Sequence, residues 1–425
     1  MSKKKVAVEK PENESTSSQV LREILTGSPV RTLLSILVGF LVGAIFMVAF
    51  NPEVLNAMGY LFGRPADAFG AIGKTIGDGY GALFRGAIYN SQAADFATAI
   101  RPITETLRFA APMIMAGLGV GLGFRVGLFN IGAVGQMAFA LIGVTYVATR
   151  IELPFVIHTF VAVAVAVAFA AAWGAIVGFL KARTGAHEVI VTIMLNYVAL
   201  NLFSFFLRTP GLLLEEGGAG TPKSDPAAES SVLPNLFTDQ YRLHWGLVIA
   251  IGATFFYWWL MERSTIGYRF RMVGFNASAA KASGIQVERT FVWAMAASAA
   301  FAGLAAANQG LTAVGGVTPS IHANIGFDAI TVALLGGSRA GGIFAAGLLF
   351  GAFKAGGPAM QVVGVAPEIL NVVQALIVMF IAAPPLIRAL FKLPQPPKRK
   401  PISEWISARL GKPVAGTSVE QKVGK

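Results

Sequence analysis

The stretch FRVGLFNIGAVGQ, residues 124–136, sets two amide side chains between long apolar segments. Asn130 and Gln136 stand there among several glycines. An unpaired polar group in hydrocarbon costs several kcal/mol, so such amides face protein, water or a ligand. Glycines permit close backbone contact or a break in a helix. The stretch therefore indicates either a place where a transporter handles its cargo, or a tight cytoplasmic turn followed by a helix-packing face.

Composition assigns the chain to the polytopic membrane proteins. Hydrophobic residues make up 55% of the 425 and charged residues 13%, against roughly 25% charged residues in soluble domains. Mean hydropathy is +0.63, and the 48 glycines suit close helix packing in lipid. There is no cysteine and the four histidines are scattered, so we expect no metal site and no cofactor. The expected fold class is all-α.

Apolar segments of about 20 residues mark the expected membrane spans. Counting a short segment at 327–337 gives ten crossings, whereas treating 327–360 as a re-entrant hairpin gives eight. The expectation is thus about 8–10 transmembrane helices, with possible re-entrant or broken helices. The segments are approximately 32–50, 104–123, 130–149, 155–180, 189–207, 244–261, 290–311, 327–337, 343–360 and 367–390.

The basic residues predict an orientation. With the N-terminus in the cytoplasm, 24 of the 34 lysines and arginines fall on the inner side, as the positive-inside rule requires. Basic cytoplasmic tails at 1–31 and 391–425 then flank a transmembrane domain at 32–390. No signal-peptide cleavage site is evident, so the first apolar segment is expected to be an uncleaved anchor. Orientation accounts for the positive net charge, and no nucleic-acid partner is expected.

Two external segments are expected, at 51–103 and 208–243. The first is glycine-rich and moderately hydrophobic, which is typical of amphipathic helices lying on the outer surface; the second is a flexible acidic loop. Each either contacts an external partner or only covers the helix ends. AFGAIGKT at 68–75 resembles a phosphate-binding loop, but it lacks the α/β surroundings such a loop needs, so no nucleotide site is expected there.

The inner segment 262–289, ERSTIGYRFRMVGFNASAAKASGIQVER, is long and basic. A short helix is expected around 277–283, with Gly284 at its C-cap. The pattern Ala-Ala-x-x-x-Gly that ends at Gly284 resembles the EAA-x-x-x-G loop of ABC importer permeases, with serine where glutamate is usual. In that family the helix docks into the ATPase subunit, and a plain connecting loop is the alternative. The resemblance therefore implies that coupling to the ATPase subunit depends on Ser278, Ala279, Ala280 and Gly284.

Other stretches resemble, in the same order, the permeases that import nucleosides and related simple-sugar solutes. GLFNIGAVGQ at 127–136 resembles their GLFNIGAEGQ run, with Val134 in place of the acidic residue. GAHEVIVTIMLNYVALN at 185–201 resembles their TNEVIxTxMLNYxA segment, with His187 in place of asparagine. Two further matching stretches are FAGLAAANQG at 301–310 and GFDAITVALLGG at 326–337.

The resemblance covers roughly residues 104–390. It implies the transmembrane permease subunit of an ABC importer in a bacterial cell membrane, with alternating access driven by a separate ATPase subunit. It also implies an external solute-binding lipoprotein and a second permease subunit, most simply as a heterodimer. The implied solute is nucleoside-like, with sugars such as ribose or galactose as the nearest competitor.

Polar side chains at helical spacing are the candidate pathway residues. Glu188, Thr192 and Asn196 share one helix face at i, i+4 and i+8. These side chains either line the passage or hold helices together by hydrogen bonds. Asp328, which follows Gly326, is expected to cap a helix. The full set of candidate pathway residues is Asn130, Gln136, Glu188, Thr192, Asn196, Asn308 and Gln309, and a second polar stripe comprises Glu368, Asn371 and Gln374.

Two other function classes remain open at this point. An ion-coupled secondary transporter or channel would need no ATPase, but it usually keeps charged pairs at mid-membrane. Only Glu188, Asp328 and Glu368 are candidates, and the sequence shows no basic residue clearly buried beside them. A membrane enzyme is disfavoured because no nucleophile–base or metal arrangement can be assembled. The chain is therefore expected to be a transport subunit and not an enzyme.

Overall fold

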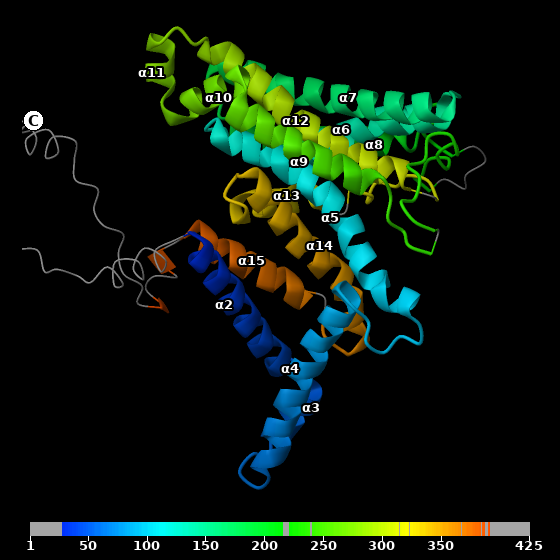
Figure 1. Cartoon of the computed structure of the whole chain (residues 1–425), viewed down its shortest axis with the longest axis vertical. Helices are drawn as coiled ribbons and strands as arrows, with labels where there is room; N and C mark the ends of the chain where they lie inside the picture. Colours follow the sequence, from blue (N-terminus) through cyan, green and yellow to red (C-terminus); the bar gives the residue numbers. More distant parts are fainter. Residues whose placement is uncertain are drawn as a thin grey trace, which may run out of the picture. The chain divides into compact units, whose positions relative to one another are not determined.

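The computed structural model describes residues 28–215, 221–238, 240–313, 315–322, 324–366, 368–383, 385–386 and 390–391 (Figure 1). It divides into two compact units, one made of Met1–Ser35 with Ala383–Lys425 and the other of Ile36–Ala382. Nearly all described helices belong to the second unit, including every helix that carries a candidate residue. The expected tails 1–31 and 391–425 lie almost entirely outside the described residues.

The described residues form helices and no strand, which confirms the expected all-α class. Six of the helices are long and apolar enough to cross a membrane. The helices are α2 (Ser28–Ala49), α3 (Pro52–Met58), α4 (Pro65–Ala87), α5 (Phe96–Arg125), α6 (Ala133–Arg150), α7 (Phe155–Thr184), α8 (Glu188–Phe206), α9 (Gly246–Arg263), α10 (Thr265–Phe275), α11 (Ala277–Ala282), α12 (Val287–Leu311), α13 (Ile325–Leu335), α14 (Ala340–Val362) and α15 (Glu368–Ala382).

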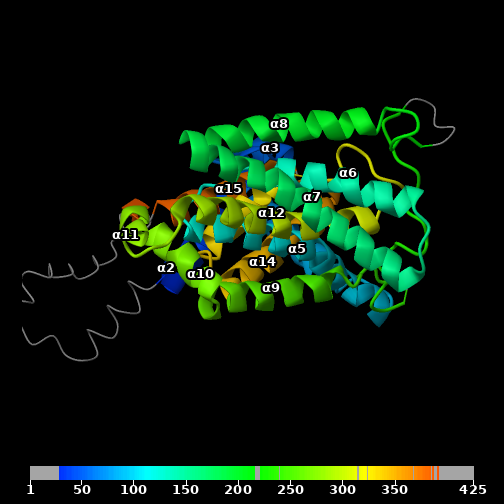
Figure 2. The same cartoon turned by 90° about the horizontal axis from the view of Figure 1, so that it is seen from above.

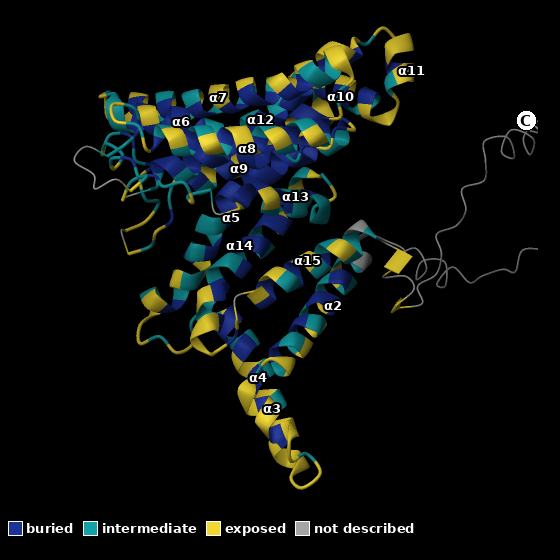
Figure 3. Ribbon diagram, turned by 180° about the vertical axis from the view of Figure 1, so that it is seen from behind, coloured by how far each residue is buried: buried dark blue, intermediate teal, exposed yellow. Residues whose placement is uncertain are grey.

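Two helices, α5 and α12, form the centre of the larger core (Figure 3). They pack closely because small residues face each other. A Cβ on Gly119 of α5 would overlap the Ser298 carbonyl of α12, and one on Gly174 of α7 would lie 2.6 Å from the Met295 carbonyl oxygen. Backbones approach this closely only where side chains are absent. The glycine content therefore does serve helix packing, as the composition predicted.

A second, smaller core joins α2, α4, α14 and α15. Val373 and Ile377 of α15 are fully buried there, and a Cβ on Gly39 or Gly43 of α2 would collide with them. Helix α4 belongs to the region expected to be amphipathic, and it does bury one face while the opposite face is exposed. Helix α14 is part of this cluster and also packs against α5, so it connects the two cores.

Helices α10 and α11 lie at one end of the group of helices that form the larger core, and the 208–243 loop lies at the other end (Figure 1). The α10 end also contains the turn that follows α13, because the Tyr257 hydroxyl of α9 donates to Ser338 O at 2.8 Å. The loop end contains the C-terminal end of α12, where the backbone N–H of Leu233 donates to Leu311 O. The segment 262–289, expected inside the cell, and the segment 208–243, expected outside, are thus at opposite ends.

The short segment expected at 327–337 is helix α13, which begins inside the bundle. Gln309 of α12 donates to Ile321 O at 3.0 Å, so the chain enters α13 from the loop end. It leaves at Ser338, at the α10 end. Ile321 and Ser338 therefore lie toward opposite ends of the helix group, but α13 between them has eleven residues and is shorter than a membrane span.

The expected inner loop 262–289 is more ordered than predicted. It contains the short helix α11, as expected, but also α10, an eleven-residue helix that the sequence analysis missed. Ser264 begins α10 by accepting a hydrogen bond from Gly267 N at 2.9 Å. Gly274 then packs against the C-terminal end of α5, where a Cβ would overlap Arg125 O. Contact with α5, and not an apolar repeat, accounts for this helix.

Candidate functional site

A buried network of amides fills the break between α5 and α6. Asn130 Nδ2 donates to Gln136 Oε1 at 3.2 Å and to Ser298 Oγ at 2.8 Å. Asn130 Oδ1 accepts from Gly132 N at 2.9 Å and from Gln136 Nε2 at 3.1 Å. Ser298 Oγ in turn donates to Gly119 O at 2.6 Å. All four hydrogen-bonding positions of the Asn130 side chain are used by protein.

This network holds together three segments that are far apart in sequence. Asn130 belongs to the break itself, Ser298 to α12 and Gly119 to α5. Asn130 and Gln136 are each 1% exposed. A fully satisfied polar network in a medium of low dielectric is stiff, and losing one member leaves its partners unpaired. The sequence indicated either that these amides handle cargo or that they belong to a turn followed by a helix-packing face. Their hydrogen bonds to neighbouring segments match the packing role.

The stripe Glu188, Thr192 and Asn196 lies on one buried face of α8, as predicted. Asn196 Oδ1 accepts from Gly135 N at 2.8 Å, and its Nδ2 donates to Ile131 O at 3.0 Å. Gly135 is in the first turn of α6, where backbone N–H groups lack partners within the helix. Asn196 therefore caps α6 from a neighbouring helix, a task that the preceding glycine cannot perform.

The buried Glu188 and the half-buried Asp328, for which the sequence showed no basic partner, both have lysine partners, which corrects the sequence analysis. Lys181 Nζ of α7 lies 2.6 Å from Glu188 Oε2, and Lys354 Nζ of α14 lies 3.0 Å from Asp328 Oδ2. The expected cap at Asp328 is also wrong, because α13 already begins at Ile325 and Asp328 lies in its first turn. Each lysine comes from a different helix, so sequence spacing did not reveal the pairs.

The remaining candidates lie in several different environments. Asn308 is buried against the start of α9, where a Cβ on Gly246 would overlap its amide. Gln309 is half-buried and holds the 312–322 segment through its bond to Ile321 O. The second polar stripe is split between two environments: Gln374 is buried, while Glu368 and Asn371 are exposed.

Helix α8 also carries an exposed stripe that the sequence analysis missed. It consists of one side chain per helical turn, and each of the apolar or aromatic members is more than half exposed. Asn201 is exposed within this stripe and donates to Tyr197 O at 2.8 Å. Among the described helices, α8 packs mainly against α6 and α7, and it lies at the edge of the helix group (Figure 2). The stripe is Ile190, Met194, Tyr197, Asn201 and Phe205.

The short helix α11 is fixed at both ends by local hydrogen bonds. Asn276 Oδ1 accepts from Ala279 N at 3.0 Å at its start. At its end Gly284 has φ +84°, and Ile285 N donates to Ala280 O at 3.0 Å, a Schellman ending. The C-terminal glycine was correctly predicted.

The four residues assigned to coupling do not all face the same way. Ser278, Ala279 and Gly284 are exposed, whereas Ala280 is completely buried against the rest of the chain. Ala280 therefore anchors the helix, and the other three form its free surface.

Glu262, at the end of α9, connects α10 to the helix bundle. Its Oε1 lies 2.5 Å from Arg125 Nη1 of α5 and its Oε2 lies 2.8 Å from Arg271 Nη1 of α10. The hydrogen bond from Arg125 is the main cause that lowers the pKa of the Glu262 carboxyl. A carboxylate with a lowered pKa remains ionised at neutral pH, so both ion pairs persist there. A displacement of α10 would thus reach α5 and α9 through Glu262.

The sequence matches, over residues 103–383, the family described as the branched-chain amino acid transport system permease component. The chain belongs to this family. It is therefore a multi-pass membrane protein and the permease subunit of an ABC importer. This assignment favours a transport subunit over the ion-coupled carrier or channel that the sequence analysis kept as its alternative.

Three relatives show how similar this permease is to named transporters. It is 37% identical to the guanosine ABC transporter permease protein NupP of Bacillus subtilis, over 74% of this chain and 88% of the relative. It is 32% identical to the nucleoside ABC transporter permease protein NupB of Lactococcus lactis, over 87% and 93%. It is 30% identical to the glucose ABC transporter permease protein TsgB13 of Haloferax volcanii, over 84% and 86%. No solved structure matches the chain.

Proposed function

We propose that this permease carries a nucleoside into a bacterial cell, after an external solute-binding lipoprotein delivers it. Two of the three relatives named above are a guanosine and a nucleoside permease. The third relative is a glucose permease, and a sugar is therefore the second candidate solute. A nucleoside combines an aromatic base with a hydroxylated sugar, so its passage needs both apolar and hydrogen-bonding surface.

The exposed stripe of α8 is the observation that carries this proposal. A polar side chain on a membrane-spanning helix is costly where it faces lipid, so Asn201 is better placed beside water, solute or a partner. Tyr197 offers an aromatic face on which a base can stack, and the Asn201 amide can pair with ribose hydroxyls or base edges. We infer that α8 forms one wall of the passage and that the second permease subunit forms the opposite wall.

The buried candidates then have a positioning role in that wall. Asn196 and Glu188 fix α8 against the break between α5 and α6 through Gly135 N and Phe129 N. Asn130 and Gln136 stiffen that break. Thr192 belongs to the same face, where its hydroxyl donates to Glu188 O. Asn308 and Gln309 organise the outer end of α12, where solute would enter.

The second permease subunit is best taken to be a different chain. Bacillus subtilis has two proteins named as guanosine transporter permeases, NupP and NupQ, and this chain resembles both. It is 37% identical to NupP over 318 residues but 26% identical to NupQ over 264. The chain would then occupy the NupP-like position in a heterodimer.

ATP hydrolysis is assigned to a separate subunit that docks on α11. The exposed residues Ser278, Ala279 and Gly284 form the contact surface, and Glu262 passes the movement of α10 to α5 and α9. The α10–α11 end is the cytoplasmic end in this proposal, in agreement with the concentration of basic residues there. Both termini are cytoplasmic in the same arrangement.

Uptake competition tests the solute. Cells without their own nucleoside uptake would express this chain with its ATPase, second permease and binding protein, and accumulation of labelled guanosine would be followed. We expect unlabelled nucleosides to abolish the signal and a large excess of glucose to leave it unchanged. Accumulation of labelled glucose, with no accumulation of any nucleoside, would assign the transporter to sugars instead.

A further inference from the structure

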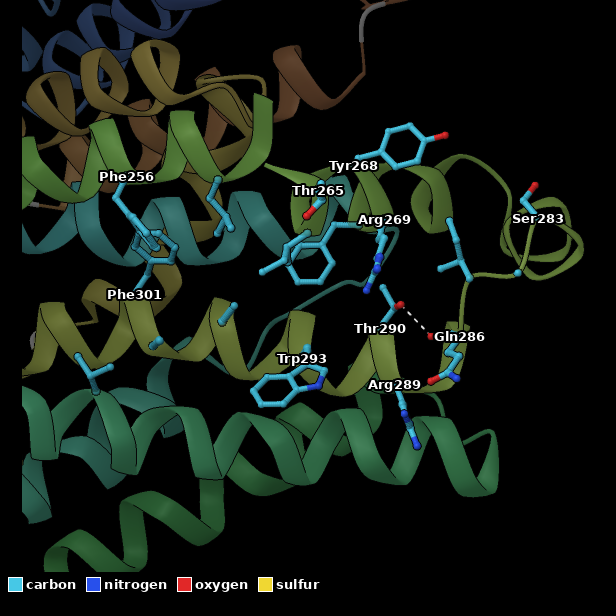
Figure 4. Close-up of a pocket in the computed structure, with 18 of the residues that line it drawn as sticks. Phe256, Thr265, Tyr268, Arg269, Ser283, Gln286, Arg289, Thr290, Trp293 and Phe301 are labelled. Carbon is cyan, nitrogen blue, oxygen red and sulfur yellow. Dashed lines mark hydrogen bonds between the residues drawn. The ribbon is translucent and has the colours of Figure 1, made fainter. Parts of the chain in front are cut away.

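A groove with a volume of about 1240 Å³ runs between α9, α10 and α12 (Figure 4). It has no part in the passage proposed for α8. Figure 2 shows α8 and α9 on opposite sides of the helices that form the core. The groove begins beside the segment Ser283–Gln286, directly after α11, and extends along α12 as far as Leu304.

The lining changes from basic to aromatic to apolar along the groove. Arg269 and Arg289 lie at the α11 end, and Arg269 points from α10 toward α12 (Figure 4). Trp293 follows on α12, and its side chain is 69% exposed. Phe256 and Phe301 lie at the far end, with their rings 6.2 Å apart. Head-group level, aromatic belt and hydrocarbon succeed each other in the same order in a membrane leaflet.

The length of the groove also corresponds to one leaflet. Arg289 and Leu304 are separated by 15 residues of a continuous helix, which amounts to about 22 Å. A bilayer with its head groups is about 40–45 Å thick, so one leaflet is roughly half of that.

The charge at the basic end is not balanced by protein. Within the part of the chain that the structure describes, neither Arg269 nor Arg289 has a carboxylate within ion-pair distance. Glu288, the nearest acidic residue in sequence, instead pairs with Lys281 at 3.2 Å. Arg183 and Glu288 line a neighbouring cavity of about 570 Å³ that shares Arg289, so arginine charge also exceeds carboxylate charge there. Guanidinium groups in such a setting suit a phosphate.

We propose that the groove binds an anionic phospholipid of the inner leaflet. Its phosphate lies between Arg269 and Arg289, and an acyl chain follows α12 past Trp293 to Phe301. The proposal rests on the proposed function only in placing the α10–α11 end in the cytoplasm. Because the head group would lie against Ser283–Gln286, the lipid would also support the segment that holds α11.

Lipid binding to the purified full-length chain tests this directly. Native mass spectrometry in detergent would compare added phosphatidylglycerol with phosphatidylcholine of identical acyl chains. We expect phosphatidylglycerol to bind more tightly than phosphatidylcholine. The affinity for phosphatidylglycerol should fall about fivefold in Arg269→Gln or Arg289→Gln and about thirtyfold in the double variant. The matched control is Arg339→Gln, because Arg339 is an exposed arginine at the same end but outside the groove. This substitution should leave the affinity for phosphatidylglycerol unchanged.

Equal binding of the two lipids to the unaltered chain would overturn the proposal, and this comparison depends on no variant. So would a loss in Arg339→Gln equal to that in the groove variants. The readout needs neither ATP nor solute. A failure here therefore leaves the proposed transport function standing, and a failure of uptake leaves the lipid site standing.

Photochemical labelling identifies the occupant in a membrane. Because the chain has no cysteine, Ala300→Cys provides a unique attachment point within the groove for a benzophenone. Irradiation in vesicles containing phosphatidylglycerol should yield an adduct of the mass of one lipid. An adduct with the second permease subunit or the ATPase would show that protein fills the groove and would overturn the proposal.

Discussion

Asn130 and Asn201 are both asparagines on or beside membrane helices, but their surroundings are opposite. Asn130 is buried and its amide is completely occupied by Gly132, Gln136 and Ser298. Asn201 is exposed on α8 and donates only toward its own helix, to Tyr197 O. A change at the first site should therefore affect folding, and a change at the second should affect transport.

Asn130→Ala should destabilise the chain by about 1–3 kcal/mol, because Gln136 and Ser298 would keep buried polar groups without partners. Thermal unfolding of the chain in detergent, followed by circular dichroism, measures this. Asn201→Ala is the matched control and should unfold at the wild-type temperature. If both variants unfold at the wild-type temperature, the network does not stabilise the fold.

Asn201→Ala should instead reduce uptake at normal membrane abundance, through a raised KM for the solute. The physical reason is the loss of a hydrogen-bonding group from the passage wall. Initial uptake rates over a range of nucleoside concentrations give KM and the maximal rate separately. Val198→Ala, at an exposed position outside the stripe, is the control; wild-type kinetics in Asn201→Ala would remove α8 from the passage wall.

The sequence predicted which of these residues share a helix face, but not which residues pack against that face. The spacing of Glu188, Thr192 and Asn196 correctly predicted a shared helix face, because side chains repeat every 3.6 residues in any α-helix. Periodicity does not indicate which helix covers that face. The partners Lys181 and Lys354, and the exposed Asn201, depend on tertiary packing and were therefore missed.

At the scale of elements, α11 is a short helix with one anchored and one free side. Ala280 is buried and Ala279 is exposed, although they are neighbours in the sequence. The helix is connected to the bundle through α10 and the ion pairs of Glu262. Mutations on the two sides should therefore have different consequences.

Ala279→Trp should abolish ATP-driven uptake and leave the folded chain intact, because the bulky ring obstructs only the docking surface. Ala280→Trp should destabilise the chain by about 1–3 kcal/mol through overpacking. Co-purification of the ATPase with each variant, together with thermal unfolding, separates the effects. Full ATPase binding and uptake by Ala279→Trp would rule out docking at this helix.

Glu262→Gln should uncouple ATP hydrolysis from uptake with little loss of stability. Its carboxylate is partly exposed, and ion pairs in such positions contribute about 0–1 kcal/mol. Because the pKa of Glu262 is lowered in the folded chain, this small contribution is present at neutral pH. It is lost as the pH falls below about 4.3 and through the lower folded value. Coupling is measured as solute transported per ATP hydrolysed in vesicles, and an unchanged ratio would contradict this role.

The element pattern explains which helices could be predicted. Long apolar segments such as 155–180 and 290–311 correspond to α7 and α12, since twenty apolar residues permit few alternatives. Helix α10 was missed because its residues alternate glycine, arginine and aromatic side chains without an apolar repeat. It is held by Ser264, by Arg271 and by contact of Gly274 with α5.

At the scale of the molecule, two surfaces of this permease are assigned to transport. One is the exposed side of α8, assigned to the passage and the second permease. The other is the free side of α11, assigned to the ATPase. The described chain itself offers no group of histidine, cysteine or carboxylate residues that could hold a metal. In the proposed function, solute movement follows from conformational change imposed on the chain from α11.

Solute accumulation in reconstituted vesicles tests this account most directly. The chain would be reconstituted with its second permease, ATPase and binding protein, and in a parallel preparation by itself, with labelled guanosine outside. Accumulation is predicted only in the complete assembly, only with ATP on the ATPase side, and not with an imposed proton or sodium gradient. Concentrative uptake by the chain alone, driven by such a gradient without ATP, would contradict it.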